Sequence, residues 1–279
     1  MPTTESSWSL ERDRHDVVQL IVPSRNEAER LPATLASLRR YVDDGAAGLG
    51  SRIEVIVVDN DSSDDTARLA READSPELPI RVVHCDRLGK GAAVRAGVAV
   101  SDAHLVGFID ADGATSWNAL NAALELLGAG ADAAIGSRAL DTSSVQAPRG
   151  LVRRTGAAAF RWAARSIVPT FSDTQCGFKV LRGDLARQVF ADLRATGFSF
   201  DVELLARLVS RNSSVVEFGV EWTDVPGSTF RPHFDGPGAL VELGRIACRM
   251  QLERPRGHHL TWSPPVRTVT PDLVALPFH

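Results

Sequence analysis

Short, largely apolar runs rich in valine and isoleucine alternate with segments of helical spacing in the first half of the chain. Residues 17–22 and 53–58 are two such runs, and their composition is typical of strands buried on both faces of a sheet. Between them, Leu31, Leu35 and Leu38 recur at the spacing of one helix face. This alternation predicts an α/β fold with a Rossmann-like, mostly parallel sheet flanked by helices.

The pattern also predicts where the elements lie. Predicted strands cover residues 17–22, 53–58, 80–83, 104–109, 131–135, 177–181 and 215–222. Predicted helices cover residues 28–41, 64–73, 90–100, 117–127, 149–168, 183–193, 202–210 and 239–253. Residues 1–16 are expected to be flexible, residues 17–253 to form one domain, and the proline-rich residues 254–279 to be an extended or disordered tail.

Composition and charge narrow the class of protein. The net charge of −4 shows no basic excess, so a nucleic-acid partner is not expected. The three cysteines, Cys85, Cys176 and Cys248, have no zinc-site or disulfide-framework spacing, and a reducing cytoplasm is the simplest location. No apolar run reaches the roughly 18 residues of a membrane span, so membrane contact would be peripheral, at the inner face.

Polar residues follow the predicted strands in four places. These segments are residues 23–27 (PSRNE), 59–61 (DND), 110–112 (DAD) and 136–138 (GSR). Ligands of open α/β sheets bind beyond the carboxyl ends of the strands, so we expect the four segments to meet at one edge. The first of them is not a phosphate loop, because neither GxGxxG nor GxxxxGK[ST] is present.

Asp110 and Asp112 are the central candidates for chemistry. Two carboxylates that are one residue apart at a strand end can hold Mg²⁺ or Mn²⁺, which prefer oxygen ligands and usually bridge a substrate diphosphate. The alternative is an ordinary turn followed by a helix cap, since Asp-Gly pairs are common in turns. The position at the shared edge favours the metal site.

Other candidates each have a structural alternative. Asp59 can accept the N–H of a uracil ring, or belong to a helix cap with its acidic neighbours. Lys90, between two glycines, can meet a phosphate or lie in an exposed turn. Asp173 can orient or deprotonate an acceptor hydroxyl, or be a turn carboxylate. Asp201 and Glu203 offer another carboxylate pair, with Asp201 equally a candidate helix cap. The arginines between 149 and 165 form a solvated face or hold an anionic acceptor.

Taken together, these segments resemble glycosyltransferase family 2, and within it the dolichyl-phosphate β-glucosyltransferases and their bacterial relatives. The matching motifs occur in the family's order over residues 17–250. They are PSRNE (23–27), VDNDSSDDT (58–66), KGAAVRAG (90–97), DADGAT (110–115), GSR (136–138), DTQCGFK (173–179), FDVELL (200–205) and WTDVPGS (222–228). Any one of them is a weak signal, whereas eight in order form a strong one.

The resemblance implies a GT-A fold, a UDP-sugar donor that is expected to be UDP-glucose, and inversion to a β-linkage. It divides the domain into a nucleotide-sugar half (17–138) and an acceptor half (139–253). The residues expected to line the uridine site are Pro23, Arg25, Glu27 and Asp59.

The remaining roles also come from the resemblance. Lys90 is expected near the donor nucleotide, and Asp110 and Asp112 are expected to hold the sugar nucleotide and its metal, Mg²⁺ or Mn²⁺. Arg138 is expected to approach the diphosphate or the acceptor. Asp173 occupies the place of the catalytic base in soluble members of the family, and would mainly position an acceptor that is already an anionic phosphate.

Three departures from the family pattern bear on the acceptor and the local backbone. The turn glycine of VDDGS is replaced by Asp61, the membrane anchor of the eukaryotic enzymes is not seen, and Thr229 replaces the lysine of GSK. Arg231 is a candidate replacement for that lysine, and His233 nearby is a lone histidine that more often does not bind metal.

These departures leave two acceptors open, a polyprenyl phosphate or a hydroxyl of a soluble small molecule such as a nucleoside. A non-catalytic UDP-sugar-binding protein is a further alternative, against which the intact DADGAT and DTQCGFK motifs argue. A nucleotidyltransferase would need a glycine-rich loop after the first strand, and PSRNE is not one.

Overall fold

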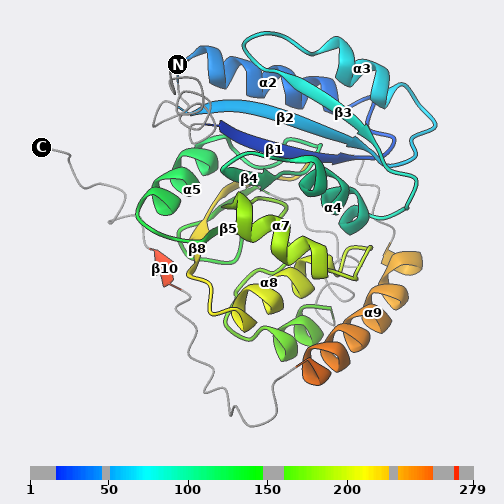
Figure 1. Cartoon of the computed structure of the whole chain (residues 1–279), viewed down its shortest axis with the longest axis vertical. Coiled ribbons are helices and arrows are strands. Elements are labelled where there is room, and N and C mark those ends of the chain that lie inside the picture. The colour runs from blue at the N-terminus through cyan, green and yellow to red at the C-terminus, as the bar shows by residue number, and fades with distance from the viewer. Residues whose placement is uncertain (1–16, 46–50, 147–159, 226–231, 254–266, 270–279) are drawn as a thin grey trace, which may run out of the picture.

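A central eight-stranded sheet organises the protein, as the computed structural model shows for residues 17–45, 51–146, 160–225, 232–253 and 267–269 (Figure 1). The strand order is β10-β8-β5-β7-β4-β1-β2-β3. The strands of this sheet are β1 (Val17–Ser24), β2 (Arg52–Asp59), β3 (Ile80–His84), β4 (Leu105–Phe108), β5 (Ala133–Ser137), β7 (Lys179–Arg182), β8 (Val215–Gly219) and β10 (Arg267–Val269). A separate two-stranded sheet pairs β6 (Ser144–Gln146) with β9 (Glu221–Thr223).

Helices cover both faces of the sheet (Figure 1). They are α2 (Leu31–Asp43), α3 (Thr66–Glu72), α4 (Lys90–Val100), α5 (Asn118–Gly128), α7 (Gly183–Asp192), α8 (Phe200–Ser210) and α9 (Pro232–Leu252), with a further helical segment at 160–167. Helices α2, α3 and α5 pack on one face, while α4, α7 and α8 pack on the other, and α9 lies against α8. This arrangement confirms the predicted α/β class with flanking helices.

Alternation along the strands separates two buried apolar layers. In β1, Ile21 faces α4 and belongs to the layer that also contains Phe108. Its neighbours Leu20 and Val22 face the opposite way, toward Leu35 of α2. Because successive side chains of a strand point to opposite faces, a strand that is covered on both sides must be apolar at nearly every position, as the sequence is.

One strand departs from the expected parallel arrangement. β7 runs antiparallel to both of its neighbours, β4 and β5, and its first residue Lys179 pairs with Phe108 and Ile135 at their carboxyl ends. The loop that enters β7 therefore lies at the edge where the parallel strands end. The apolar pattern of β7 predicted a strand but not its direction, since direction is set by tertiary pairing.

Several predicted boundaries shift. The helix expected from residue 28 begins at Leu31, and the one expected from 64 begins at Thr66, because residues 24–28 and 61–66 bind one another instead. The strand expected over 215–222 is interrupted at Val220 and divides between the two sheets. Residues 149–159 of the expected arginine-rich helix lie outside the described residues, while 267–269 of the tail form β10.

Close packing of α4 on the sheet leads to a stability prediction. A Cβ added at Gly97 would lie 2.5 Å from Ile21 Cγ2 and 3.1 Å from Val58 Cγ2, so we expect Gly97→Ala to lower the free energy of unfolding by about 1–3 kcal/mol. Gly128→Ala in α5 is the matched control, because a Cβ there meets nothing within 4 Å. Urea unfolding of both variants tests this, and equal stabilities would contradict the packing.

Candidate active site

The carboxyl ends of β1, β2, β4 and β5 lie on one edge of the sheet, as expected. Their shared direction follows from the parallel pairs β1–β2 and β1–β4, together with β7 running antiparallel to both β4 and β5. Backbone bonds continue across the ends: Asn60 N–H donates to Ser24 O at 2.8 Å, and Ile109 N–H to Ile21 O at 3.0 Å. The polar segments after these strands are thus neighbours in space.

The segments after β1 and β2 fix each other. The backbone N–H of Glu27 donates to Thr66 Oγ1 at 2.8 Å, and that of Ala28 to Asp64 Oδ2 at 3.1 Å. Asn26 completes the contact, with its N–H donating to Ser62 Oγ at 3.0 Å. The side chains of the second motif therefore shape the loop of the first, and Asp64 also accepts the N–H of Thr66, the first residue of α3, at 3.0 Å.

Asp61 takes the place of the turn glycine. Its φ is +58°, in the left-handed region where glycine is usual and where aspartate is among the better tolerated residues. The chain thus makes the turn that the missing glycine would make. Asp59, at the end of β2, keeps a buried carboxylate, with Oδ2 lying 3.2 Å from His84 Nδ1.

Lys90 and Asp110 form the ion pair at the centre of the edge. Lys90 Nζ lies 2.5 Å from Asp110 Oδ1. Burial opposes both charges, yet the attraction outweighs it, so the pKa of Asp110 is lowered and that of Lys90 is raised. Gly177 leaves room for this carboxylate, because a Cβ at that position would overlap it.

A second group of charges surrounds Asp112. Burial and the neighbouring Asp110 raise the pKa of Asp112. Burial also raises the pKa of Glu27, despite its hydrogen bonds from Arg30 at 2.8 Å and 2.5 Å, and both aspartates add to that rise. The remaining terminal nitrogen of Arg30, Nη1, is buried without a hydrogen-bond partner. The carboxylates of Glu27, Asp110 and Asp112 and the guanidinium of Arg30 therefore lie close together at this edge.

The donor set suits a divalent cation that is completed by a substrate. Among the described residues, no group of three or more histidine, cysteine, aspartate or glutamate side chains is arranged to hold an ion alone. Mg²⁺ and Mn²⁺ commonly use one or two carboxylates and take their other ligands from water and phosphates. Asp112, whose charge is penalised by burial and by Asp110, is the group that a cation would relieve most directly.

Arg138 and Asp173 form a bidentate pair across the edge. Arg138 Nε donates to Asp173 Oδ2 at 2.7 Å and Nη2 to Oδ1 at 3.1 Å, and the guanidinium lies 5.5 Å from the ring centre of Trp222. Burial raises the pKa of Asp173, but the bonds from Arg138 outweigh it and hold that pKa below its usual range. Buried Glu217 supports the loop by accepting the N–H of Asp173 at 2.9 Å.

Lys179 holds the loop that carries Asp173 through buried hydrogen bonds. Its fully buried ammonium donates to Cys176 O at 2.7 Å and to Asp201 Oδ1 at 2.6 Å, with Thr174 O at 3.5 Å. Of the two interpretations of Asp201, the helix cap is wrong, because the carboxylate pairs with Lys179 and the α8 cap position is Ser199. The loop that carries Asp173 and Gly177 is thus held by a buried charge pair.

Comparison with known proteins shows which family the chain resembles. A sequence profile described as "Glycosyl transferase family 2" matches residues 19–181. The dolichyl-phosphate β-glucosyltransferase of Drosophila melanogaster is 34% identical over 259 residues, which cover 88% of this chain and 75% of that protein. That of Homo sapiens is 32% identical over 228 residues, covering 77% and 70%.

The chain belongs to glycosyl transferase family 2. It is a glycosyltransferase with the GT-A fold. Glucosyl-3-phosphoglycerate synthase of Mycobacterium tuberculosis, in complex with Mn²⁺, UDP-glucose and phosphoglyceric acid, superposes with a TM-score of 0.61 at 17% identity. The match covers 92% of this chain and 88% of that one. The same enzyme in complex with UDP gives a TM-score of 0.61 at 19% identity.

The glycosyltransferase brings most of the predicted residues together. Glu27, Asp59, Lys90, Asp110, Asp112, Arg138 and Asp173 all lie at the carboxyl edge, with Pro23 half-buried and Arg25 exposed on the same loop. Their contacts with uridine, diphosphate and acceptor stay predictions.

Other predicted positions lie elsewhere. Arg231, the GSK-like segment 227–229 and the His233 side chain are outside the described residues, as are Arg149, Arg153 and Arg154. Arg161 and Arg165 are exposed on the 160–167 helix. Among the helices that the structure describes, none has the length and apolar character needed to cross a membrane.

Sequence reasoning missed the residues that support the site. Asn60 is one, since its side chain bonds the backbone of Arg87 and Gly89 and so ties β2 to the start of α4. Arg30, Lys179 and Glu217 are the others. A charged residue inside an apolar run, such as Glu217 in β8, is the only signal in the sequence that points to a buried partner.

The buried ion pair between Lys179 and Asp201 leads to a prediction about stability. Lys179→Met should lower the free energy of unfolding by about 3–5 kcal/mol, because it leaves the Asp201 carboxylate buried without a partner. The double variant with Asp201→Asn should be less destabilised, since no unpaired charge remains. Arg68→Met, which breaks two exposed pairs, is the control and should leave stability nearly unchanged, because exposed ion pairs contribute little. Equal losses in Lys179→Met and Arg68→Met would contradict the assignment.

The stability lost when Arg138 is replaced should depend on pH, because Asp173 titrates. In the folded protein the lowered pKa of Asp173 makes its carboxylate stabilising above its unfolded pKa of about 4, and this contribution is lost only below that. In Arg138→Met burial remains without the arginine, so the pKa of Asp173 rises and its charge becomes destabilising at neutral pH. The stability deficit of the variant should therefore shrink between about pH 7 and about pH 5.

Urea unfolding at the two pH values measures this deficit. Combining Arg138→Met with Asp173→Asn removes the titrating group, so that double variant should show a pH-independent deficit. A deficit of Arg138→Met that stays constant or grows toward low pH would rule out the coupling.

Proposed function

We propose that this glycosyltransferase moves glucose from UDP-glucose to a polyprenyl phosphate and inverts the configuration at C1. The observation that carries the proposal is the 34% identity, over most of both chains, to an enzyme named dolichyl-phosphate β-glucosyltransferase. The UDP and UDP-glucose bound to the structural neighbours support the choice of donor.

The chemistry is a single displacement at the sugar. An oxygen of the acceptor phosphate forms a bond to C1 while the bond from C1 to the β-phosphate oxygen of UDP breaks, so UDP leaves with the bonding electron pair. The second pKa of a phosphate monoester is about 6, so the attacking oxygen is already ionised at neutral pH and needs no strong base. Inversion to a β-linkage follows from attack opposite to the leaving group.

The residues at the edge fit this displacement. Asp173, with its lowered pKa and both oxygens bonded to Arg138, is suited to holding that arginine rather than to taking a proton. Arg138 would then face an anionic group, either the acceptor phosphate or the donor diphosphate. Lys90, fixed by Asp110, would lie beside the diphosphate and favour the charge that develops on departing UDP.

Asp110 and Asp112 would hold the divalent cation. When bound, Mg²⁺ or Mn²⁺ supplies positive charge that neutralises the departing diphosphate. Structural neighbours that bind Mn²⁺ or Mg²⁺ together with UDP support this expectation. The crowding of Asp112 with Asp110, which together with burial raises the pKa of Asp112, supports a cation at this position.

A soluble acceptor is the second candidate. A structural neighbour that binds phosphoglyceric acid favours it, since that compound is a small phosphorylated acid. Transfer to a hydroxyl would make Asp173 the proposed base. The pairing of Asp173 with Arg138 weighs against this, because a lowered pKa makes a weaker base.

The test incubates the protein with radiolabelled UDP-glucose, Mg²⁺ or Mn²⁺, and polyprenyl phosphate in detergent. We expect label in the organic phase, a β-linked product by NMR, and a loss of about a hundredfold or more in Asp112→Asn. Asp44→Asn, which changes an exposed carboxylate after α2, should leave the rate unchanged. Donor binding without label in the organic phase would reject the lipid acceptor, and small phosphorylated and hydroxyl acceptors would then be tested.

A further inference from the structure

The segment at 193–198, between α7 and α8, is held by two glutamates that come from different helices. Glu203 Oε2 of α8 accepts the backbone N–H groups of Arg194 at 3.0 Å and Ala195 at 2.7 Å. Glu242 Oε1 of α9 accepts those of Thr196 at 3.1 Å and Gly197 at 3.4 Å. Four consecutive N–H groups therefore donate to carboxylates of α8 and α9.

Carbonyl groups of the same segment accept hydrogen bonds from α4, which carries Lys90, and from the loop that carries Asp173. Thr196 O accepts the N–H of Ala92 at 3.1 Å, in the first turn of α4, and Leu193 O accepts Arg95 Nη1 at 3.0 Å. Phe198 O accepts Gln175 Nε2 at 3.3 Å, from the loop that carries Asp173. The segment thus joins the outer helices to both sides of the proposed site.

Two glycines allow α4 to approach this closely. Cβ atoms at Gly89 or Gly91 would overlap, respectively, the carbonyl of Thr196 or the backbone and side chain of the 195–200 region. Between them lies Lys90, whose ammonium pairs with Asp110. On the opposite side, Gly89 N–H donates to Asn60 Oδ1 at 2.8 Å. The backbone of Lys90 is consequently fixed between Asn60 and Thr196.

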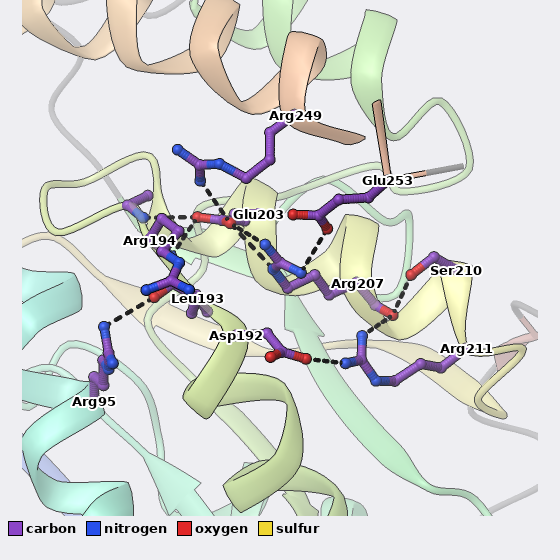
Figure 2. A network of polar contacts seen from close by, with 11 residues as sticks. Arg95, Asp192, Leu193, Arg194, Glu203, Arg207, Ser210, Arg211, Arg249 and Glu253 are labelled. Carbon is purple, nitrogen blue, oxygen red and sulfur yellow. Dashed lines mark hydrogen bonds and ion pairs between the residues drawn. The ribbon is translucent and has the colours of Figure 1, made fainter. Parts of the chain in front are cut away.

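The two glutamates are not equally secured. Glu203 is fully buried, and burial raises its pKa, but the Ala195 N–H and Arg207 outweigh this effect and lower it. Arg207 at 2.8 Å and Arg249 of α9 at 2.9 Å complete its coordination, with Glu253 closing the network on Arg207 (Figure 2). Glu242 is half-buried beside the buried Leu243 of α9. Its position depends on the docking of α9.

We propose that Glu242 is a positioning residue for Lys90. By holding the N–H groups of Thr196 and Gly197, it sets the carbonyl on which the first turn of α4 rests, and so the reach of the Lys90 ammonium. The inference rests on the proposed function, in which Lys90 lies beside the donor diphosphate. We call Glu203 and Glu242, which together hold the segment at 193–198, the glutamate clamp. Both residues lie beyond residues 19–181, so the clamp belongs to the part of the chain outside the family profile.

A double-mutant cycle on the full chain tests the proposal. The affinity for UDP in the presence of Mg²⁺ or Mn²⁺ is measured by calorimetry for the wild type, Glu242→Ala, Lys90→Ala and the double variant. We expect Glu242→Ala to weaken binding about tenfold. The double variant should bind no more weakly than Lys90→Ala, because Glu242 acts only through that lysine.

Two further variants separate the clamp from a general loss of structure. Glu242→Gln keeps an acceptor oxygen and should bind UDP more tightly than Glu242→Ala, since a neutral acceptor retains roughly half of such a bond. Gln251→Ala changes an exposed position on the same helix and should bind normally. Amide hydrogen exchange in Glu242→Ala should rise at Thr196 and Gly197 and stay constant at Arg194 and Ala195.

The outcomes are distinct. Additive losses in the double variant, or unchanged binding in Glu242→Ala, overturn the positioning role while leaving the proposed donor intact. A wild type that binds no UDP with either metal overturns the proposed function, and the clamp with it. If Glu242→Ala does not fold, Glu242→Asp replaces it in the same cycle, since its shorter side chain cannot reach both N–H groups.

Discussion

Buried and half-buried carboxylates lie close together at the carboxyl edge of the sheet, and each of these charges needs a compensating group nearby. An ionised group in such a place is tolerated only when a cation or several hydrogen bonds compensate it. Asp110 has Lys90, Asp173 has Arg138 and Asp201 has Lys179, each at 2.7 Å or less. Asp112 has no such close partner among the described residues, and burial and the neighbouring Asp110 raise its pKa.

These pairs link segments that are far apart in the chain. Lys90 belongs to α4 and Asp110 follows β4, while Arg138 follows β5 and Asp173 precedes the antiparallel β7. Reversal of β7 matters here, because it returns the chain to the edge where the parallel strands end. A parallel strand in the same place would carry the Asp173 loop to the opposite edge, where it could not meet Arg138.

Support for the site continues outward through backbone groups. Helix N–H groups and loop carbonyls that would otherwise be unsatisfied are used as connections between layers, as in the segment at 193–198. Hydrogen bonds connect α9 to that segment and the segment to the first turn of α4, next to Lys90. Such preorganisation is what electrostatic stabilisation of a departing diphosphate requires, because dipoles and charges must already point the right way.

Much of the structure of residues 17–138 follows from the sequence. Apolar runs such as 17–22 and 53–58 predict buried strands, the helix at 90–100 matches its predicted bounds, and polar residues directly after the strands predict the edge of the candidate site. Local pattern suffices there because period and burial are coupled in covered parallel strands.

Tertiary structure decided the rest. The direction of β7, the pairing of Asp201 with Lys179 rather than with a helix end, and the left-handed turn at Asp61 all depend on contacts between distant segments. A sequence records which groups carry charge, but the partner of a buried charge is set by which segments the fold brings within hydrogen-bonding distance.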